Sequence, residues 1–430
     1  MYANEYSPRK LDALIQSDET SSLPALKKRH NRDDYLRRIS AKVVGKTFQF
    51  ENFAQVRIGQ FHAYEPTRLG DRLVLRRLNN VLRRTYRVKQ SDRTDVVRQA
   101  IKLLSEPTPK HVLKLDIKGF YESIDRNRLL DQLDQDQLLS DRSRWLLRQL
   151  FSTVDESVPK GLPRGINVSA TLSEIVMRHI DLQIRQIEGV YFAARYVDDI
   201  LLFCISDPNR IIQIISALLP DGMSLNAKKT KHIYVGCRCA ECCVHAGANC
   251  PCVPNCACVP DPKLQRDLHY LGYRLRFNNV PSKEEKKKKE MQVRVGLAAN
   301  KVSRYKSRVA IAFQSNIRTP NFDLLEDRIR FLCENSRLMG PGLRGRLKTG
   351  IRFNYPLIND YEELKDLDQF LRSQLFARRN AHGARLSASL TDKQREILAV
   401  LSFQSGHKHY RSKIVHSSAF GQIKACWKHA

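Results

Sequence analysis

The sequence predicts an α+β protein with more than one subdomain. Runs rich in β-branched and aromatic residues occur at 111–117 and 191–205, and each is followed by a stretch with apolar residues every three or four positions. The chain has 430 residues, of which 42% are apolar, so it can bury more than one hydrophobic core. We therefore expect two or three subdomains that combine strands with helices.

The N-terminal quarter is predicted to be mainly helical. Residues 1–60 carry mixed charge with an uneven helical pattern, which predicts one or two helices of unassigned function. From 68 to 104 the chain is basic, and its leucine spacing predicts helices with one apolar stripe. The expected members of this stripe are Leu73, Leu75, Leu78 and Leu82.

The segment 111–117 is expected to be a strand, because it follows a Pro-Thr-Pro break and is rich in β-branched and leucine residues. With a side-chain period of two, Val112, Lys114 and Asp116 share one face of that strand. This face carries two charged side chains, so we expect Asp116 to be exposed to solvent. Residues 125–151 then predict one or two helices with a solvated face.

A glycine-bounded turn at 161–165 leads into the next predicted helix. We expect this helix to begin after Asn167 or Ser169, because both residue types are good N-caps. A further helix is predicted at 209–219, directly after the strand pair of 191–205.

Two adjacent carboxylates, Asp198 and Asp199, separate the two apolar halves of 191–205. Their repulsion is costly between hydrophobic strands, unless a divalent cation binds them or they lie in an exposed turn. Asp116 ends the other strand-like run. Three aspartates from two neighbouring strands can hold two Mg²⁺ ions about 4 Å apart, the arrangement used in nucleotidyl transfer. We therefore favour metal binding over the alternative of an exposed hairpin turn.

The chain is strongly basic, with a formal net charge of +29. Such an excess raises the affinity for polyanions, because each neutralised phosphate releases a condensed counterion. No run of 18 or more apolar residues occurs, and the start of the chain, MYANEYSPRK, has no apolar segment after a basic one. We expect a nucleic-acid-binding protein that is soluble, does not engage membranes and acts in the cytoplasm.

Five blocks of sequence together resemble the successive palm motifs of a reverse transcriptase. The blocks are 112–125, 161–174 (GLPRGINVSATLSE), 196–199 (YVDD), 225–231 (LNAKKTK) and 268–275 (LHYLGYRL). They occur in the family's order and span about half of the chain. The sequences of these blocks are most similar to those of the bacterial unknown-group enzymes, the defence-associated reverse transcriptases that protect cells from phage.

The resemblance implies a right-hand polymerase with fingers, a palm built on an antiparallel sheet, and a helical thumb. The expected parts are an N-terminal extension (1–67), fingers (68–110), a palm (111–280, with fingers elements within 125–165) that holds a Cys-rich insertion (236–262), and a helical thumb and C-terminal region (281–430).

The resemblance also assigns functional residues. Asp116, Asp198 and Asp199 match the catalytic carboxylates of the family, and the expected magnesium ligands are these three together with Ile117. Tyr121 matches the steric gate, an aromatic ring that would collide with a ribose 2′-hydroxyl and so favour deoxynucleotides. The alternative for Tyr121 is an ordinary core aromatic.

Several basic residues match substrate-binding positions of the family. Arg164 stands where retroviral enzymes carry Gln, and an Arg adds a fixed positive fork suited to phosphate or to a base edge. Lys229 matches a lysine near the departing pyrophosphate, with Lys228 as the competing assignment. Arg77, Lys89 and Arg93 are candidates for binding the template or the triphosphate, and a solvated helix face is the alternative for each.

The chain departs from the family pattern in a cysteine cluster that holds eight of its eleven cysteines. Its members are Cys237, Cys239, Cys242, Cys243, Cys250, Cys252, Cys256 and Cys258. A disulfide knot needs an oxidising compartment, and nothing in the sequence indicates export. We expect structural zinc, with an iron–sulfur cluster or redox-active thiols as the alternatives.

These features predict an RNA-templated DNA polymerase that uses dNTPs and two Mg²⁺ ions. The resemblance further implies anti-phage defence, a dedicated noncoding RNA template, and a second reverse transcriptase or effector as in the type 3 systems; a homo-oligomer is left open. Two other functions were weighed, a catalytically idle nucleic-acid-binding scaffold and an intron-type maturase. The maturase is disfavoured because no nuclease motif or recognisable DNA-binding tail follows the thumb.

Overall fold

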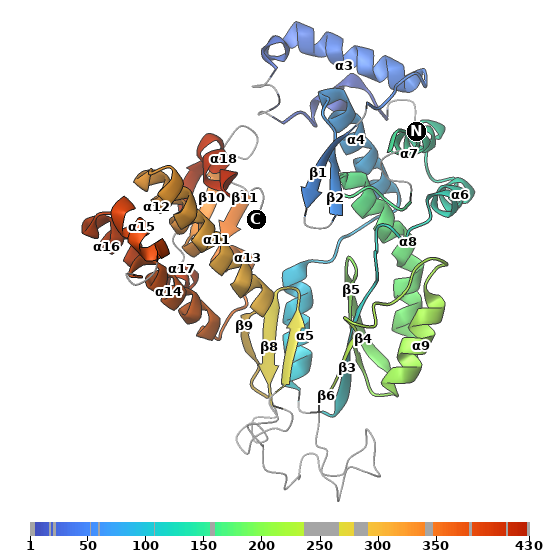
Figure 1. Ribbon diagram of the computed structural model, residues 1–430. Coiled ribbons are helices and arrows are strands. Elements are labelled where there is room, and N and C mark those ends of the chain that lie inside the picture. Colours follow the sequence, from blue (N-terminus) through green and yellow to red (C-terminus); the bar gives the residue numbers. More distant parts are fainter. Residues whose placement is uncertain are drawn as a thin grey trace, which may run out of the picture. The chain divides into compact units, whose positions relative to one another are not determined.

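The computed structural model describes residues 5–16, 19, 23–51, 53–58, 61–106, 108–154, 160–235, 266–278, 291–339, 347–377, 381–409 and 412–427. The chain divides into two compact units, the first made of Met1–Asp92 with Pro109–Val235 and the second of Arg93–Thr108 with Gly236–Ala430 (Figure 1). The cysteine cluster of 237–258 lies outside the described residues. Within them, no helix is both long and apolar enough to cross a membrane.

The first unit combines helices with a hairpin and a four-stranded sheet. Its helices are α1 (Pro8–Asp12), the 3₁₀ helix η1 (Pro24–Lys27), α3 (Arg29–Val44), α4 (Leu69–Thr85), α6 (Arg126–Asp136), α7 (Asp141–Val154), α8 (Asn167–Gln186) and α9 (Pro208–Leu218). Its strands are β1 (Ala54–Ile58), β2 (Phe61–Glu65), β3 (Lys110–Asp116), β4 (Val190–Tyr196), β5 (Asp199–Cys204) and β6 (Lys231–Val235).

The four-stranded sheet of the first unit is antiparallel, with the strand order β4-β5-β3-β6. Helices α8 and α9 lie along one face of this sheet (Figure 1). Leu113 and Leu202 are cross-strand partners, and both side chains are fully buried. The strands expected at 111–117 and 191–205 are therefore present, as the core of the unit.

The leucines predicted within 68–104 are buried, as expected, but they do not form a single stripe. Leu73, Leu75, Leu78 and Leu82 are all buried, at 2% exposure or less, on α4. At about 100° per residue, Leu73 and Leu75 lie on nearly opposite sides of α4, so this helix is buried on more than one face. Each buried leucine contributes about 1.5–3 kcal/mol to stability. Helix α4 packs against α8 of the same unit.

The helix starts differ in detail from the expectations. Helix α8 begins at Asn167 itself, and its N-cap is Ile166, which makes no side-chain cap. The expected caps at Asn167 and Ser169 were therefore wrong, since the Ser169 hydroxyl instead donates to the Pro163 carbonyl at 2.7 Å. Helix α9 begins one residue earlier than expected, because the Asp207 carboxylate caps its first turn.

The hairpin formed by β1 and β2 was not expected from the sequence. Its strands show little apolar alternation, and most of their side chains are exposed. The hairpin is held by a distant turn, because the Tyr64 N–H donates to the Arg164 carbonyl at 2.7 Å. The Tyr64 side chain is also buried, at 6% exposure. A tertiary contact thus decides the structure of this segment.

The second unit is mainly helical, as expected for the C-terminal region, but it also contains two small sheets. Its helices are α5 (Arg93–Ser105), α11 (Ala299–Arg318), α12 (Phe322–Cys333), α13 (Ile351–Asn354), α14 (Glu362–Leu375), α15 (Ala381–Ser389), α16 (Asp392–Ala399), α17 (Phe403–Lys408) and α18 (Ser417–Ala425). Its strands are β7 (Arg266–Tyr270), β8 (Tyr273–Phe277), β9 (Arg294–Leu297), β10 (Asn335–Met339), β11 (Leu347–Gly350) and β12 (Ser412–His416).

The two sheets of the second unit have different topologies. Strands β7, β8 and β9 form an antiparallel sheet in that order. Strand β10 lies between β11, to which it is antiparallel, and β12, to which it is parallel. The strands β10 to β12 were not predicted, because β10 and β12 are far apart in the sequence and their pairing leaves no local periodic signal.

Candidate active site

The three predicted catalytic aspartates meet at one end of the four-stranded sheet. Asp116 ends β3 and Asp199 begins β5, and the two residues are cross-strand partners. Asp198 lies in the two-residue turn between β4 and β5, and its carbonyl accepts a hydrogen bond from the Ile117 N–H at 3.1 Å. Its turn neighbour Val197 has φ +60°, a left-handed conformation that is rare for β-branched residues and is often found at functional sites.

Asp116 is buried, at 4% exposure, so the expectation that it faces solvent was wrong. The segment after α9 covers it. The Lys229 ammonium donates to Asp116 Oδ1 at 2.9 Å, and the Asn226 amide donates to Oδ2 at 3.2 Å. The backbone adds to this cover, because the Asn226 N–H donates to the Asp116 carbonyl at 2.7 Å. The predicted Lys229 therefore lies beside a predicted catalytic carboxylate.

A second lysine, Lys114, was not assigned from the sequence. Its ammonium lies 3.4 Å from Asp199 Oδ1, so each of two aspartates has one lysine partner. The signal for Lys114 was present, because the period of two already placed it on the face of β3 that carries Asp116.

The electrostatics of this site show an excess of negative charge. Burial raises the pKa of Asp198, and the charges of Asp199 and Asp116 raise it further. Burial also raises the pKa of Asp199, where Lys114 acts in the opposite direction. Among the described residues, no three His, Cys, Asp or Glu side chains are already arranged around a common metal position. The donor chemistry nevertheless fits Mg²⁺, which prefers carboxylate oxygens, and a cation would offset the repulsion.

Tyr121 and Arg164 contact each other. The guanidinium carbon of Arg164 lies 5.2 Å from the centroid of the Tyr121 ring and 4.1 Å from that of Phe61 on β2. Glu122 accepts two hydrogen bonds from the same guanidinium, at 2.6 Å and 2.9 Å. These bonds raise the pKa of Arg164, so it stays charged. The sequence analysis did not single out Glu122 and Phe61, which both contact the predicted Arg164.

Two glycines allow the turn at 161–165 to approach its neighbours. A Cβ at Gly161 would lie 2.3 Å from the Tyr121 carbonyl oxygen, and one at Gly165 would lie 2.7 Å from the Tyr64 carbonyl oxygen. Both glycines have positive φ, at +74° and +90°. The turn is thus packed tightly between the backbone at Tyr121 and the β1–β2 hairpin, which places Arg164 between them.

Arg77 and Arg93 donate hydrogen bonds to backbone carbonyls elsewhere in the chain. Arg77 Nε donates to the Glu5 carbonyl at 2.6 Å and so holds the N-terminal segment. Arg93 belongs to the second unit, where it donates to the Leu271 carbonyl at 2.9 Å and to the Asn354 carbonyl at 3.0 Å. Their roles in substrate binding stay predictions.

A basic cluster surrounds the β7–β8 turn of the second unit. A Cβ at Gly272 in this turn would lie 3.1 Å from Lys301 Cε and 3.2 Å from Arg93 Nη2. The pKa of Lys301 is lowered by burial, and then by the charges of Arg304, Arg93 and Arg308. Cations crowded to this degree favour a polyanionic ligand.

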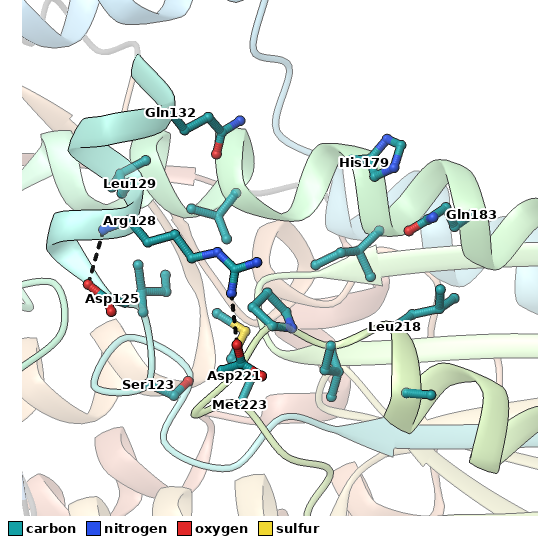
Figure 2. A pocket seen from close by; sticks show the side chains of 16 residues that line it. Ser123, Asp125, Arg128, Leu129, Gln132, His179, Gln183, Leu218, Asp221 and Met223 are labelled. Carbon is teal, nitrogen blue, oxygen red and sulfur yellow. Dashed lines mark hydrogen bonds and ion pairs between the residues drawn. The ribbon is translucent and has the colours of Figure 1, made fainter. Parts of the chain in front are cut away.

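A cavity of about 510 Å³ opens between α6, α8 and α9 in the first unit (Figure 2). The ion pair of Arg128 and Asp221, 3.2 Å apart, lies at this cavity. Its apolar lining includes Leu129, Ile180 and Met223. The predicted catalytic and substrate-binding residues are not among the residues that line it.

Comparison with known proteins identifies a family that part of the chain matches. Residues 67–275 match the family model described as reverse transcriptase (RNA-dependent DNA polymerase). No curated protein matches the chain. The match includes the three aspartates together with Tyr121, Arg164 and Lys229, but not the second unit's helices after β8.

Two solved structures of telomerase show a distant likeness. One, an apo telomerase from Candida tropicalis truncated from the C-terminal domain, is 14% identical, with a TM-score of 0.30, over 49% of this chain and 43% of that chain. The other, apo telomerase from Candida tropicalis, is 12% identical, with a TM-score of 0.37, over 92% of this chain and 71% of that chain.

This chain therefore spans less than half of the first telomerase chain, and TM-scores this low do not establish a common fold. The family match and the site geometry rest on the same segment. Residues 67–275 of this chain form a reverse transcriptase domain, which is a nucleotidyltransferase domain of the RNA-directed DNA polymerase class.

Proposed function

We propose that the whole protein is an RNA-templated DNA polymerase that extends a primer with dNTPs. The observation that carries the proposal is the pairing of Asp116 with Asp199 across two strands, with Asp198 in the adjoining turn. These three carboxylates lie within the segment that matches the reverse transcriptase family. The raised pKa values of Asp198 and Asp199, together with the burial of Asp116, are typical of a catalytic site rather than of a solvated turn.

In this proposal Asp116, Ile117, Asp198 and Asp199 hold two Mg²⁺ ions. When bound, the ions supply a charge clamp for the attacking and leaving oxygens of nucleotidyl transfer. Lys229 is suited to neutralise the departing pyrophosphate, because its hydrogen bond to Asp116 raises its pKa and keeps it protonated. Tyr121 acts as the gate against the ribose 2′-hydroxyl.

The basic cluster at the β7–β8 turn supports a nucleic-acid ligand for the second unit. Lys301, Arg304 and Arg308 lie on α11, and the chain carries a net charge of +29. Phosphate backbones bind such surfaces without regard to sequence. We assign residues 68–110 to the fingers, 111–280 to the palm, and 281–430 to the thumb and C-terminal region.

The biological setting is part of the proposal. The sequences of 112–125 and 161–174 are most similar to those of bacterial defence enzymes. We therefore propose a cytoplasmic anti-phage role with a dedicated noncoding RNA. The partners that this role implies are a second reverse transcriptase or an effector. The cysteine cluster would bind structural zinc in the reducing cytoplasm.

The test of the polymerase is to replace Asp198 or Asp116 by Asn. The amide keeps the side-chain shape but removes the charge that Mg²⁺ needs, so incorporation of dNTPs on a primed RNA template should vanish. Binding of the same RNA should stay near wild type. Because a lost metal ligand should cost several kcal/mol, a variant that retains more than about a hundredth of the wild-type rate would contradict the assignment.

The same variants separate the polymerase from the idle scaffold. Phage protection that persists at full strength in Asp198→Asn cells would favour a scaffold role. A wild-type protein that binds RNA but never incorporates dNTPs, with any divalent metal supplied, would do the same.

A further inference from the structure

Four side chains from three segments form a connected group around Arg164. Phe61 comes from strand β2, Tyr121 and Glu122 from the loop after β3, and Arg164 from the glycine-bounded turn. Both Tyr121 and Arg164 are close enough to Asp198 for its charge to act on their pKa values. The group therefore borders the catalytic aspartates.

The geometry of the pair formed by Glu122 and Arg164 restricts the guanidinium. Its Nε and Nη2 atoms each donate to a different oxygen of Glu122, at 2.6 Å and 2.9 Å. A two-point bond between a planar guanidinium and a carboxylate resists rotation, which a single bond does not. The Phe61 ring, 4.1 Å from the guanidinium carbon, adds a cation–π contact.

The effect of Arg164 is to support the Tyr121 ring. The guanidinium carbon lies 5.2 Å from the centroid of that ring. The ring is also supported by an edge-to-face contact with Phe120 at 5.4 Å and by its packing against the hydrophobic core of the first unit. Because these supports remain when Arg164 moves, the loop should stay folded while the ring gains freedom.

We propose that Glu122 and Phe61 are positioning residues for sugar selection, which act by holding the Arg164 guanidinium against the Tyr121 ring. Glu122, Phe61 and Arg164 together then set how far the Tyr121 ring projects toward the sugar of the bound nucleotide. This inference rests on the proposed polymerase function. It also makes the β1–β2 hairpin, which the sequence placed in an extension of unassigned function, a part of the nucleotide site.

The test is the substitution Glu122→Gln, which keeps the side-chain length but offers one acceptor oxygen instead of two and no charge. The preference for dNTPs over rNTPs, measured as a ratio of kcat/KM values, should fall about tenfold, which corresponds to about 1.4 kcal/mol. A merely structural loss would lower kcat/KM for dNTPs and for rNTPs alike, so it would leave this ratio unchanged. The variant Tyr121→Val gives the upper limit of lost discrimination.

Two further variants define the mechanism. Arg164→Lys cannot form the two-point bond, so it should lower discrimination like Glu122→Gln, and the double variant should add little to either change. Asp134→Asn is the matched control, because it removes a carboxylate that pairs with Arg144 and Arg148 on α7 of the same unit. Its discrimination should equal that of the wild type.

The outcomes separate this inference from the proposed function. If the wild type polymerises and Glu122→Gln discriminates as well as the wild type, or if the effects of Glu122→Gln and Arg164→Lys are fully additive, the inference is wrong and the polymerase stands. If the wild type does not polymerise, calorimetric binding of dTTP and UTP gives the same comparison without turnover. An unchanged ratio of affinities in Glu122→Gln then overturns the inference.

Discussion

Asp198 and Asp199 lie close to Asp116 and are partly shielded from water, so we expect both carboxylates to destabilise the folded protein. Burial is the largest cause of the raised pKa of Asp198, and the two neighbouring carboxylates add to it. A carboxyl group with a raised folded-state pKa binds its proton more tightly in the folded chain than in the unfolded chain. Stability therefore falls as the pH rises from the unfolded value through the folded value, and it stays lower above that interval.

The variant Asp198→Asn should consequently be more stable than the wild type at pH 8 in metal-free buffer, although it is inactive. We expect a gain of roughly 0.5–2 kcal/mol in the free energy of unfolding, the range typical of stabilising changes at strained functional sites. Urea titrations at several pH values would measure it, and the gain should shrink as the pH falls toward the unfolded pKa of Asp. A variant less stable than the wild type at pH 8 would show that the repulsion is already compensated.

Gly161 shows how one element depends on a close backbone contact. Its turn carries Arg164, and a Cβ at Gly161 would lie 2.3 Å from both the Tyr121 carbonyl oxygen and Glu122 Cα. These are backbone atoms, so they cannot move aside as a flexible side chain would. The left-handed conformation of Gly161 adds a second cost for any L side chain.

The substitution Gly161→Ala should therefore lower the free energy of unfolding by about 2–5 kcal/mol, the sum of backbone strain and overpacking. Gly222→Ala is the matched control, since Gly222 also has positive φ but its Cβ would meet nothing closer than 3.6 Å. That control should cost only about 1–2 kcal/mol, from backbone strain alone. Thermal unfolding measures both, and equal costs would mean that the contact with Tyr121 and Glu122 is looser than the structure shows.

On the scale of the whole molecule, the cysteine cluster of 237–258 separates the reverse transcriptase motifs at 225–231 and 268–275. Thiolates at this density would repel one another if ionised and would oxidise if free, whereas one zinc ion binds four of them. One four-cysteine site would hold one zinc ion, and two such sites would hold two. Protein purified without added zinc should therefore contain one to two zinc ions per chain by metal analysis.

Replacing Cys250 and Cys252 by Ser should lower that zinc content and leave dNTP incorporation largely intact. Cys204, which is buried on β5, and Cys333, which is buried on α12, serve as internal controls for thiol labelling. Rapid labelling of all eight cluster cysteines in the native protein, without release of zinc, would exclude the metal site. A brown preparation would instead indicate an iron–sulfur cluster.

Local patterns account for the parts of the fold that were predicted. Helix α4 with its buried leucines and the strands β3, β4 and β5 were expected, because helix and strand periods leave a direct signal in neighbouring residues. Lys114 could also have been assigned, since it shares the face of β3 with Asp116. The β1–β2 hairpin could not, because its strands are exposed and their main anchor, Arg164, lies far along the chain.

By itself, the sequence determined the chemical groups of the site and the elements that carry them: three aspartates at strand ends, an aromatic residue after β3, and a glycine-bounded turn before α8. The tertiary structure alone decided that Asp116 is buried beneath Lys229, that Arg164 bonds to Glu122, and that Phe61 contacts that same guanidinium. The physical reason is the separation along the chain of the residues that interact. Periodicity reports what each residue does within its own helix or strand, whereas burial and ion pairing depend on segments that only the folded chain brings together.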